Sequence, residues 1–415
     1  MDDTTTLTTT LIVGGGQAGI EAAFALRQNG YEGRIQVVGE ESELPYRRPP
    51  LSKAYLDGSM ARESLTIRKS PMLEKAGVEC QTGQRVTAID RDHRRVTLAD
   101  GQVMDYDDLI LATGARVRRL GGGVDAAHNV HYIRTVADID RLKPELRGGA
   151  RMLVVGGGFI GLETAASAAK AGLDVTVIEM ADRLLQRVVD APMSSYFESA
   201  HRQRGVHVLT AVGIEQWHGE QAINAVTLSN GTRLDVDVVV VGIGVVPETG
   251  LAQACGLAVD NGIVADAFSR TTDPHIYAIG DCANHANRFL GHAARLESVP
   301  AAQEQARTAA RSICGVEQPH DAVPWFWSDQ FDLKLQMAGL LGAHDQMVVR
   351  GQREDDSFVV FYLQDGAIQC AHAINRPREF AQIRKLIAAR TPVDVTRLAD
   401  DGHPVADAAL EVAND

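Results

Sequence analysis

Two stretches of the chain share one pattern of hydrophobic and polar positions, and each predicts a strand, a glycine turn, a helix and a second strand. The first stretch is residues 11–40, in which we expect the helix to run from Ile20 to Gln28. The second stretch is residues 151–179, with the same order of elements. Strands that alternate with helices in this way predict a parallel sheet.

Both turns carry glycines at the spacing of a phosphate-binding loop. Such glycines let the backbone approach a pyrophosphate, whose charge faces the N-terminus of the following helix. An unliganded loop is the alternative, but the complete order of elements disfavours it. Two units of this kind predict two dinucleotides on one chain, and therefore electron transfer between them. The glycines are Gly14, Gly16 and Gly19 in the first turn, and Gly156, Gly158 and Gly161 in the second.

An acidic residue follows the second strand of each unit, Glu40 in the first and Glu179 in the second. A carboxylate in this place binds ribose hydroxyls and repels the extra phosphate of NADP, so Glu179 favours NAD. A surface acid without a ligand is the alternative for both. Arg183 lies a few residues beyond Glu179 and keeps NADP open.

Two further apolar runs predict the strands by which the chain leaves each unit. Residues 105–115 form the first of them and end in a turn at Thr113 and Gly114. Residues 235–247 form the second, with a glycine turn at Gly242 and Gly244. Glycine at these points allows tight turns at the ends of buried strands.

The other patterned segments complete the expected architecture. Residues 84–99 predict a hairpin or a three-stranded insert, and residues 273–283 a strand that ends in a Gly-Asp turn before a long helix. Because this late strand has no glycine motif of its own, it needs an existing sheet, so we expect the second unit to interrupt the first domain. From about Ala322 the pattern changes to antiparallel strands followed by two helices.

Composition agrees with a globular protein of several domains. The chain has 415 residues, of which 45% are hydrophobic and 23% charged. No apolar run approaches the roughly 20 residues that span a bilayer, and the acidic, polar N-terminus is unlike a secretory signal. We therefore expect a cytoplasmic protein without membrane association. The net charge of −13 makes nucleic acid an unexpected partner.

The cysteines and histidines predict no metal site. Five cysteines are widely spread and form no CxxC pair, which argues against a disulfide framework, a zinc site or an iron–sulfur cluster. The histidines show no ligand-like spacing either. We expect all five cysteines to be small buried residues. They are Cys80, Cys255, Cys282, Cys314 and Cys370.

Four residues outside the glycine turns are further candidates whose roles the pattern leaves open. Asp281 could bind a ligand or cap the next helix. Lys53 follows a diproline and could equally be solvated, and Glu163 could be a solvated acid or an acid of the first helical turn. Trp327 is by default a core residue.

Over essentially its whole length the sequence resembles the FAD-dependent, NADH-using ferredoxin reductases that serve bacterial oxygenases. The glycine motifs belong to the wider flavin disulfide-reductase superfamily, whereas RLESVPAAQEQAR and PWFWSDQ are specific to the oxygenase-reductase branch. The other shared stretches are LIVGGGQAGIEAAFAL, RPPLSKAYL, LILATGA, YIRT, VVGGGFIGLE, VVGIGVVP and IYAIGDCA.

The resemblance implies an α/β fold with two Rossmann-like nucleotide-binding domains of the glutathione-reductase type and a small α+β C-terminal domain. Residues 1–115 and 246–320 would form the FAD-binding domain, and residues 116–245 the NAD-binding domain. Residues 321–415 would form the C-terminal domain, near the flavin and the partner interface.

Site residues carried over from the family cover both nucleotides and the redox centre. Lys53, Glu163 and Trp327 are the implied catalytic residues; the first two would meet beside the flavin and the nicotinamide, where the lysine favours reduced, anionic flavin. For FAD the implied residues are Gly14, Gly16, Ala18, Gly19, Glu40, Arg48, Lys53, Val86, Thr113, Gly114, Arg134, Asp281 and Val299. For NADH they are Gly156, Gly158, Ile160, Gly161, Glu179 and Gly242.

The partner is implied by a missing pair of cysteines. Disulfide reductases of this fold carry a redox-active pair where this chain has LPYRRPPLSKAY, so electrons cannot leave by dithiol exchange. The resemblance therefore implies a separate [2Fe–2S] ferredoxin, which would dock on Trp327 and a basic patch, and a monomeric or weakly dimeric reductase. Arg307, Arg311 and Lys334 are candidates for the patch, with scattered surface charge as the alternative for the last two.

Two departures from the family pattern and several rival functions remain. Val299 stands where reductases of ring-hydroxylating dioxygenases often carry Trp, which favours a cytochrome P450 system. Glu248 stands where the family often has Asn, which leaves that turn's role open. A rubredoxin reductase and an NADH:quinone or oxygen oxidoreductase are rivals of the same fold. An NADH-gated binding protein of the apoptosis-inducing-factor type is a rival of another class, and the net charge disfavours it.

Overall fold

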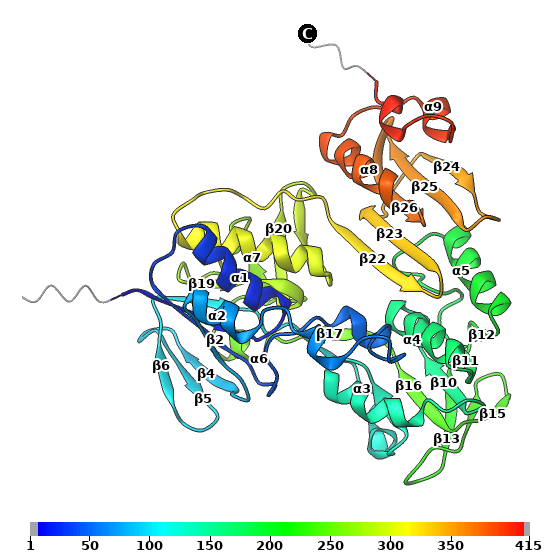
Figure 1. The fold of residues 1–415 in the computed structure, drawn as a ribbon, viewed down its shortest axis with the longest axis horizontal. Helices are drawn as coiled ribbons and strands as arrows, with labels where there is room; N and C mark the ends of the chain where they lie inside the picture. The colour runs from blue at the N-terminus through cyan, green and yellow to red at the C-terminus, as the bar shows by residue number, and fades with distance from the viewer. Residues whose placement is uncertain (1–6, 411–415) are drawn as a thin grey trace, which may run out of the picture. The chain divides into compact units, whose positions relative to one another are not determined.

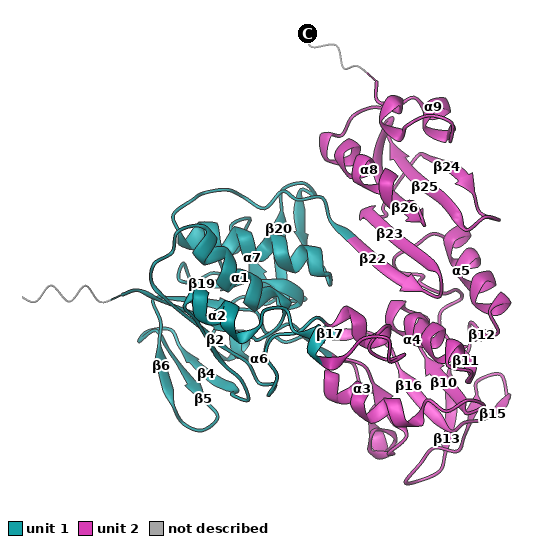
Figure 2. Ribbon diagram, in the orientation of Figure 1, with its two compact units in different colours: residues 1–47, 63–116, 246–325 teal, residues 48–62, 117–245, 326–415 magenta. Residues whose placement is uncertain are grey.

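The structure is a computed structural model that describes residues 7–410. The chain divides into two compact units (Figure 2). Each unit is built on a five-stranded parallel sheet, as the two repeated patterns predict. Unit 1 comprises residues 1–47, 63–116 and 246–325, and unit 2 residues 48–62, 117–245 and 326–415.

The sheet of unit 1 has the strand order β19-β7-β1-β2-β3. Helices α1 and α7 pack against each other (Figure 1), and Ile12 and Ile110 share a buried cluster with both. Leu11 and Leu109 point to the opposite face, because successive side chains of a strand alternate. The elements are β1 (Thr9–Val13), α1 (Gln17–Gln28), β2 (Arg34–Val38), β3 (Val78–Gln81), β7 (Asp108–Leu111), β19 (Ile276–Ala278) and α7 (Val299–Ile313).

A three-stranded antiparallel sheet covers this opposite face of the unit 1 sheet, and Val96 and Leu98 pack there against Leu11 and Leu109. The predicted insert is therefore three-stranded, and it closes the core as a third layer. The elements of this sheet are β4 (Val86–Asp90), β5 (Arg95–Leu98) and β6 (Val103–Asp105). The remaining elements of unit 1 are α2 (Ser70–Ala76), α6 (Gly250–Ala254), β18 (Ile263–Ala265), β20 (Ala283–Asn287) and β21 (His292–Ala294).

Unit 2 repeats this plan around the strand order β12-β11-β10-β16-β9. Helix α4 packs on β10 and β11, while Leu153 and Val239 face a second antiparallel sheet of three strands. The elements are β9 (Val130–Tyr132), α3 (Val136–Leu142), β10 (Arg151–Val155), α4 (Phe159–Lys170), β11 (Asp174–Ile178), α5 (Ala191–Gln203), β12 (His207–Leu209), β13 (Ile214–His218), β14 (Ala225–Leu228), β15 (Arg233–Asp235) and β16 (Val238–Val241). Two short strands, β8 (Ala115–Val117) and β17 (Val245–Pro247), pair with each other.

The C-terminal part of unit 2 is a five-stranded sheet followed by two helices, as the change of pattern predicts. The strand order is β22-β23-β26-β25-β24, and α8 packs on β23 and β26. The elements are β22 (Trp325–Gln330), β23 (Leu333–Gly339), β24 (Gln346–Gln352), β25 (Ser357–Gln364), β26 (Ala367–Ile374), α8 (Pro377–Ala389) and α9 (Val395–Ala399). The two-domain Rossmann-like fold with a C-terminal α+β part is thereby confirmed.

Two details differ from the predictions, and a third agrees with them. The first helix begins at Gln17 rather than Ile20, because Gly16 is its N-terminal cap and Gly19 lies within its first turn. The strand predicted over 235–247 is two strands, β16 and β17, because the predicted turn at Gly242 and Gly244 interrupts it and Gly244 has a φ of 99°. The late strand β19 joins β7 in the sheet of unit 1, as its missing glycine motif predicts.

The domain boundaries given above stay a prediction, since the two compact units describe only how the chain packs. Within residues 7–410, no helix is long and apolar enough to cross a membrane.

Candidate functional site

In the first glycine turn, the backbone geometry requires glycine at two positions but not at the third. Gly14 has a φ of 126°, and a Cβ on it would lie 2.1 Å from the carbonyl oxygen of Ala112. A Cβ on Gly19 would lie 2.1 Å from the carbonyl oxygen of Gly14. Gly16 has extended backbone, and a Cβ there would meet no described atom within 4 Å. The turn thus leaves open space at the N-terminus of α1, where a pyrophosphate fits.

The second glycine turn has the same construction. Gly156 has a φ of 109°, and a Cβ on it would lie 2.5 Å from the carbonyl oxygen of Gly242. A Cβ on Gly161 would lie 2.2 Å from the carbonyl oxygen of Gly156, whereas one on Gly158 would be 4.0 Å from Gly242. Ile160, the neighbour of Gly161, is 44% exposed at the start of α4. Space again opens at a helix N-terminus, so both turns fit a dinucleotide.

The two acids after the strands are not equivalent in register. Val155 pairs with Ile178, so Glu179 is the first residue after its strand, whereas Gly39 separates Glu40 from the end of β2. The Glu179 carboxylate accepts hydrogen bonds from the N–H groups of Gly157 at 2.7 Å and Ala181 at 2.8 Å. Glu179 is therefore fixed against the glycine turn.

Glu40 is bound less firmly, because its side chain is 68% exposed and its contact with Arg85 spans 3.5 Å. This exposure agrees equally with ribose binding and with a surface acid, so the role of Glu40 stays a prediction.

Arg183 has its donors occupied within unit 2. One guanidinium nitrogen donates to the Val189 carbonyl oxygen and to Ser194 Oγ, both at 2.7 Å, and the other to the Gln186 carbonyl oxygen at 3.2 Å. A guanidinium held in this way is a poor receptor for the extra phosphate of NADP. The geometry near Glu179 therefore favours NAD.

Asp281 lies close to the first glycine turn. A Cβ on Gly280 would approach the Cβ of Ala18 to 2.9 Å, and the Gly280 N–H donates to Gln305 Oε1 of α7 at 2.7 Å. After Asp281 the chain enters β20 rather than an α-helix, so the interpretation as a helix cap is wrong. Val299, the first residue of α7, follows the N-cap Ser298.

The turn after β7 is tied to the segment that follows β17. Thr113 Oγ1 donates to the carbonyl oxygen of Glu248 at 2.6 Å, and the Glu248 N–H donates to the carbonyl oxygen of Gly114 at 2.9 Å. Both bonds use the main chain of Glu248, so they do not depend on its side chain. The turn is thereby held in place for a ligand.

The other expected FAD residues lie apart from these turns in the sequence. Val86 is 6% exposed, so the contact predicted for it would have to come from its main chain. In unit 2, a guanidinium nitrogen of Arg48 donates to the carbonyl oxygen of Arg134 at 2.5 Å. The contacts of these residues with FAD stay predictions.

Lys53 and Glu163 form a buried ion pair in unit 2. Lys53 Nζ lies 2.5 Å from Glu163 Oε2, and their side chains are 18% and 2% exposed. The alternatives of a solvated lysine and a solvated acid are therefore wrong. Ser52 Oγ donates to the same carboxylate oxygen at 2.5 Å, and Ser328 Oγ donates to Oε1 at 2.6 Å. Sequence reasoning missed both serines, which no motif marks.

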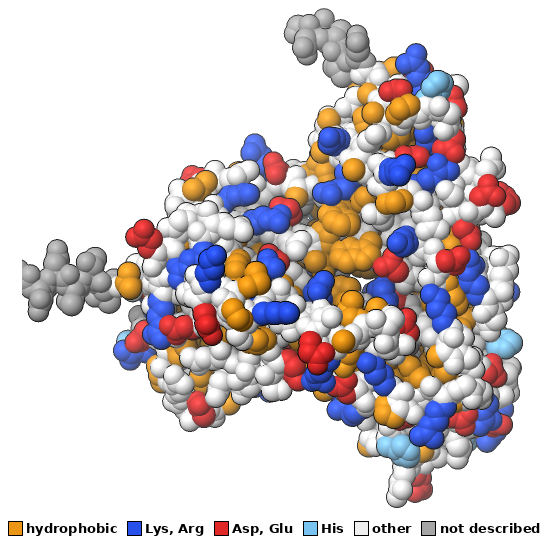
Figure 3. Space-filling view, in the orientation of Figure 1, with side chains coloured by type: hydrophobic (Ala, Val, Ile, Leu, Met, Phe, Trp, Pro, Cys, Tyr) orange, Lys and Arg blue, Asp and Glu red, His pale blue; other side chains and the backbone are white. Residues whose placement is uncertain are grey.

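The expected docking residues are spread over the two units. Arg307 is on α7 and pairs with Glu304 at 2.6 Å, which offsets its charge. Lys334 is exposed on β23, one strand from the half-buried Trp327 on β22. On the face seen in Figure 3, acidic and basic side chains are interspersed. A single basic patch that includes Arg307, Arg311 and Lys334 stays a prediction.

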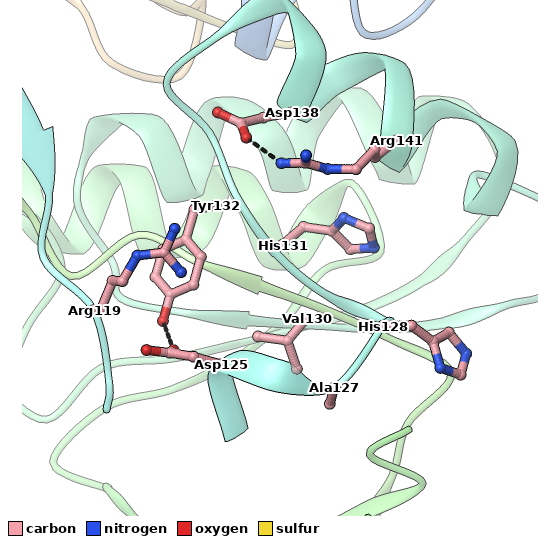
Figure 4. A pocket seen from close by; sticks show the side chains of 9 residues that line it. All are labelled: Arg119, Asp125, Ala127, His128, Val130, His131, Tyr132, Asp138 and Arg141. Atoms are coloured by element: carbon pink, nitrogen blue, oxygen red, sulfur yellow. Dashed lines mark hydrogen bonds and ion pairs between the residues drawn. The ribbon is translucent and has the colours of Figure 1, made fainter. Parts of the chain in front are cut away.

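A cavity of about 390 Å³ in unit 2, which no motif indicates, lies beside β9 and α3 (Figure 4). Its polar groups largely satisfy one another. The Tyr132 hydroxyl donates to Asp125, and Arg141 pairs with Asp138 at 2.6 Å. Burial raises the pKa of Tyr132 to about 12 and lowers that of His131, whose ring lies 3.0 Å from Glu145. The lining residues are Arg119, Asp125, Ala127, His128, Val130, His131, Tyr132, Asp138 and Arg141.

The cysteines are all free thiols. Cys282 and Cys370 are buried as expected, but that expectation is wrong for Cys80, Cys255 and Cys314, which are partly exposed. Burial nevertheless raises the pKa of Cys80 to about 11, which makes this thiol unreactive at neutral pH. In the part of the chain that the structure describes, no group of three or more His, Cys, Asp or Glu side chains could hold a metal ion.

Two glycine turns that each fit a dinucleotide at a helix N-terminus agree with an oxidoreductase that uses two nucleotides. The chain belongs to the pyridine nucleotide-disulphide oxidoreductase family, whose model matches residues 8–306. Residues 325–409 match the reductase C-terminal family. Members with this pair of domains use FAD and NAD(H), and the glycine cradles fit both groups.

Individual relatives are similar over nearly the whole chain. Putidaredoxin reductase CamA of Pseudomonas putida is 43% identical over 95% of this chain and 95% of its own length. The 5,5'-dehydrodivanillate O-demethylase ferredoxin reductase subunit of a Sphingobium species is 44% identical over 95% of this chain and 97% of its own.

Solved structures agree with these sequence relatives. A crystal structure of the covalent putidaredoxin reductase–putidaredoxin complex matches with a TM-score of 0.93 and 42% identity, covering 96% of this chain and 97% of the other. The ferredoxin reductase for the CYP199A2 system of Rhodopseudomonas palustris matches with the same TM-score and 39% identity, over 97% and 100% of the chains.

Proposed function

We propose that this protein is an FAD-dependent NADH:ferredoxin oxidoreductase that serves an oxygenase. The observation that carries the proposal is similarity to ferredoxin reductases along the whole chain, 43% identity over 95% of it in one case. When bound, FAD takes a hydride from NADH and passes on its electrons singly. The chain supplies the cradles that hold the two nucleotides and the charged groups that tune the reaction.

The cradles divide between the two nucleotides in this proposal. Residues 1–115 and 246–320 hold FAD, with the open space at Gly16 for its pyrophosphate. Residues 116–245 hold NADH, with Glu179 on the adenosine ribose. Residues 321–415 form the C-terminal domain, beside the flavin and the partner.

Lys53 and Glu163 carry the redox site of the proposal. The Lys53 ammonium supplies positive charge that favours reduced, anionic flavin. The Glu163 carboxylate offsets that charge while the site is oxidised, because an unpaired buried ammonium would be costly. Trp327 contributes an aromatic surface on β22.

The electron acceptor is a [2Fe–2S] ferredoxin. Support comes from the relative solved as a covalent complex with putidaredoxin, and from the missing cysteine pair at LPYRRPPLSKAY. Docking at Trp327 with Arg307, Arg311 or Lys334 predicts that ferredoxin reduction slows at high salt. Because Glu304 already offsets Arg307, we expect Arg307→Ala to raise the KM for ferredoxin only a few-fold, about 2–5-fold. Reduction that is insensitive to both salt and this substitution would exclude the patch.

Anaerobic mixing of the yellow holoprotein with NADH tests the whole proposal. We expect fast bleaching of the flavin, and rapid cytochrome c reduction only when a [2Fe–2S] ferredoxin is added. Equal reduction with rubredoxin would favour a rubredoxin reductase. A long-lived charge-transfer complex without turnover would instead favour an NADH-gated binding protein.

The terminal oxygenase is proposed to be a cytochrome P450, since Val299 replaces the Trp frequent in dioxygenase reductases. The similarity to the reductase of the CYP199A2 system supports this choice. Higher kcat/KM with ferredoxins of P450 systems than with those of Rieske dioxygenases is the expected result. We place the protein in the cytoplasm, where NADH is available, and cell fractionation tests this location.

A further inference from the structure

The two carboxylate oxygens of Glu163 face donors from different parts of unit 2. Oε2 faces Lys53 Nζ and Ser52 Oγ, each at 2.5 Å. Oε1 accepts a hydrogen bond from Ser328 Oγ at 2.6 Å. Ser328 is fully buried on β22, the strand that also carries Trp327. The C-terminal segment therefore reaches directly into the charged pair.

Helix α4 and strand β22 lie next to each other (Figure 1), and two pairs of their side chains meet along this contact. Phe159 and Glu163 are one helical turn apart, a rise of about 6 Å. Phe326 and Ser328 are two strand residues apart, about 6.6 Å. The Phe159 and Phe326 rings accordingly meet with their centroids 4.7 Å apart, while Glu163 meets Ser328. Because strand side chains alternate, Trp327 points to the other face of β22.

Hydrogen bonds from Gln330 and His201 determine which acceptor receives the hydroxyl proton of Ser328. Gln330 Nε2 donates to Ser328 Oγ at 3.1 Å, which leaves the serine proton for Glu163. His201 Nε2 lies 2.9 Å from Gln330 Oε1. Burial lowers the pKa of His201 to about 4, so the ring is neutral at pH 7, and the tautomer with the proton on Nε2 donates to Gln330. Every bond of the chain from His201 to Glu163 then points toward the carboxylate.

His201 Nδ1 agrees with this direction. It has no hydrogen-bond partner among residues 7–410. In the tautomer described, this nitrogen carries only a lone pair, which costs less to bury than an unpaired N–H group. Gln330 is also 1% exposed, so solvent cannot substitute for either partner.

We propose that Ser328 is a positioning residue of the redox site, which fixes the Glu163 carboxylate and through it the Lys53 ammonium. Gln330 and His201 hold Ser328 in the orientation that this requires. The proposal rests on the function given above, because it takes Lys53 as the cation beside the reduced flavin. It adds a residue of the C-terminal segment to the control of hydride transfer.

Ser328→Ala removes the donor to Glu163 Oε1 and leaves that oxygen buried without it. The carboxylate can then rotate and carry the Lys53 ammonium away from its place. We expect the rate constant of flavin reduction by NADH to fall about tenfold, as for a lost hydrogen bond to a charged group. The midpoint potential of bound FAD should also fall, because less positive charge then lies near the flavin to stabilise its reduced form.

The experiment uses the holoprotein with FAD bound, stopped-flow reduction by NADH and dye-equilibrated potentiometry. Ser312→Ala is the matched control, since this buried hydroxyl has no partner among residues 7–410. Ser328→Thr keeps the donor and should recover most of the rate and potential. Ser328→Ala in a Glu163→Gln background should cost only about threefold or less, because the charged acceptor is gone.

Wild-type rate and potential in Ser328→Ala would overturn the proposal. So would an undiminished loss in the Glu163→Gln background, since Ser328 would then act through packing. These outcomes are distinct from failure of the proposed function, in which the wild-type protein itself would not reduce ferredoxin with NADH.

Discussion

Alanine in place of Gly158 should separate nucleotide binding from folding. Gly158 has a φ of −83° and a ψ of 177°, extended backbone that any residue adopts, and its added Cβ would be 4.0 Å from the carbonyl oxygen of Gly242. Gly156 has a φ of 109°, and a Cβ there would be 2.5 Å from the same oxygen. The same methyl group thus meets open space at one position and main chain at the other.

The two substitutions should therefore change the free energy of unfolding in opposite directions. Gly158→Ala is expected to keep its stability or to gain about 0.4–1 kcal/mol, because alanine lowers the entropy of the unfolded chain. Its methyl group fills the space proposed for the NADH pyrophosphate, so the KM for NADH should rise about tenfold, or 1.4 kcal/mol. Gly156→Ala should lose about 1–3 kcal/mol to backbone strain. A loss of that size lowers the melting temperature by about 2–4 °C per kcal/mol in a domain of this size.

Thermal unfolding without NADH and steady-state kinetics with NADH measure the two effects separately. The absorbance of bound FAD verifies that the first site is intact in both variants. A wild-type KM for NADH in Gly158→Ala would refute the assignment of this space to the pyrophosphate. A melting temperature as low as that of Gly156→Ala would refute the steric reasoning.

Three further predictions concern charge. Lys53→Met should slow flavin reduction in stopped flow at least about tenfold, since the paired charge is lost, and an unchanged rate would remove the lysine from the redox site. Glu179→Gln should raise kcat/KM for NADPH relative to NADH, because the repulsion of the extra phosphate disappears; an unaltered ratio would contradict its ribose role. Burial lowers the pKa of His201 to about 4 and of His285 and His372 to about 3, so from pH 6.5 to about 4 the unfolded chain binds protons that the folded protein does not. As the pH is lowered through this range, the free energy of unfolding should fall by up to about 1.4 kcal/mol per pH unit for each histidine. A free energy of urea unfolding that is independent of pH between 6.5 and 5 would disprove this.

The glycine turns could be predicted from sequence because their requirements are local. Gly14 and Gly156 need positive φ, and Gly19 and Gly161 need close contact with the preceding turn, so glycine spacing records the geometry directly. The strand and helix patterns around them depend on the same short range, which is why the fold class follows from the sequence.

The contacts around Glu163 could not be predicted from local pattern, because they join distant segments. Ser52 lies 111 residues from Glu163, and Ser328 lies 165 residues from it. Serine, glutamine and histidine in a strand or helix give no signal of burial. The pairing of Lys53 with Glu163 was accessible only through resemblance to a family, and the serines that orient the carboxylate required the structure.

The difference between Glu40 and Glu179 could not be predicted either, because it depends on how separate strands pair. The sequence places an acid after both second strands, but only the register of β10 with β11 shows that Glu179 follows its strand directly. Glu40 comes one residue later, with Gly39 opposite the glycine turn. A shift of one residue reverses the direction of a side chain, so spacing alone could not separate the two cases.

The buried Lys53–Glu163 pair also bears on whether unit 2 catalyses a reaction or only binds a nucleotide. Taking two charges out of water costs several kcal/mol per ion, and a well-packed apolar pair is often at least as stable. Stability alone therefore does not explain an ion pair whose acid is 2% exposed and has donors on both oxygens. In the proposed function the NADH cradle is the second glycine turn with Glu179, whereas Lys53 pairs with Glu163. In the proposed reductase the charged pair tunes the flavin, a role that a protein that only binds NADH would not need, so the pair favours the reductase over an NADH-gated binding protein.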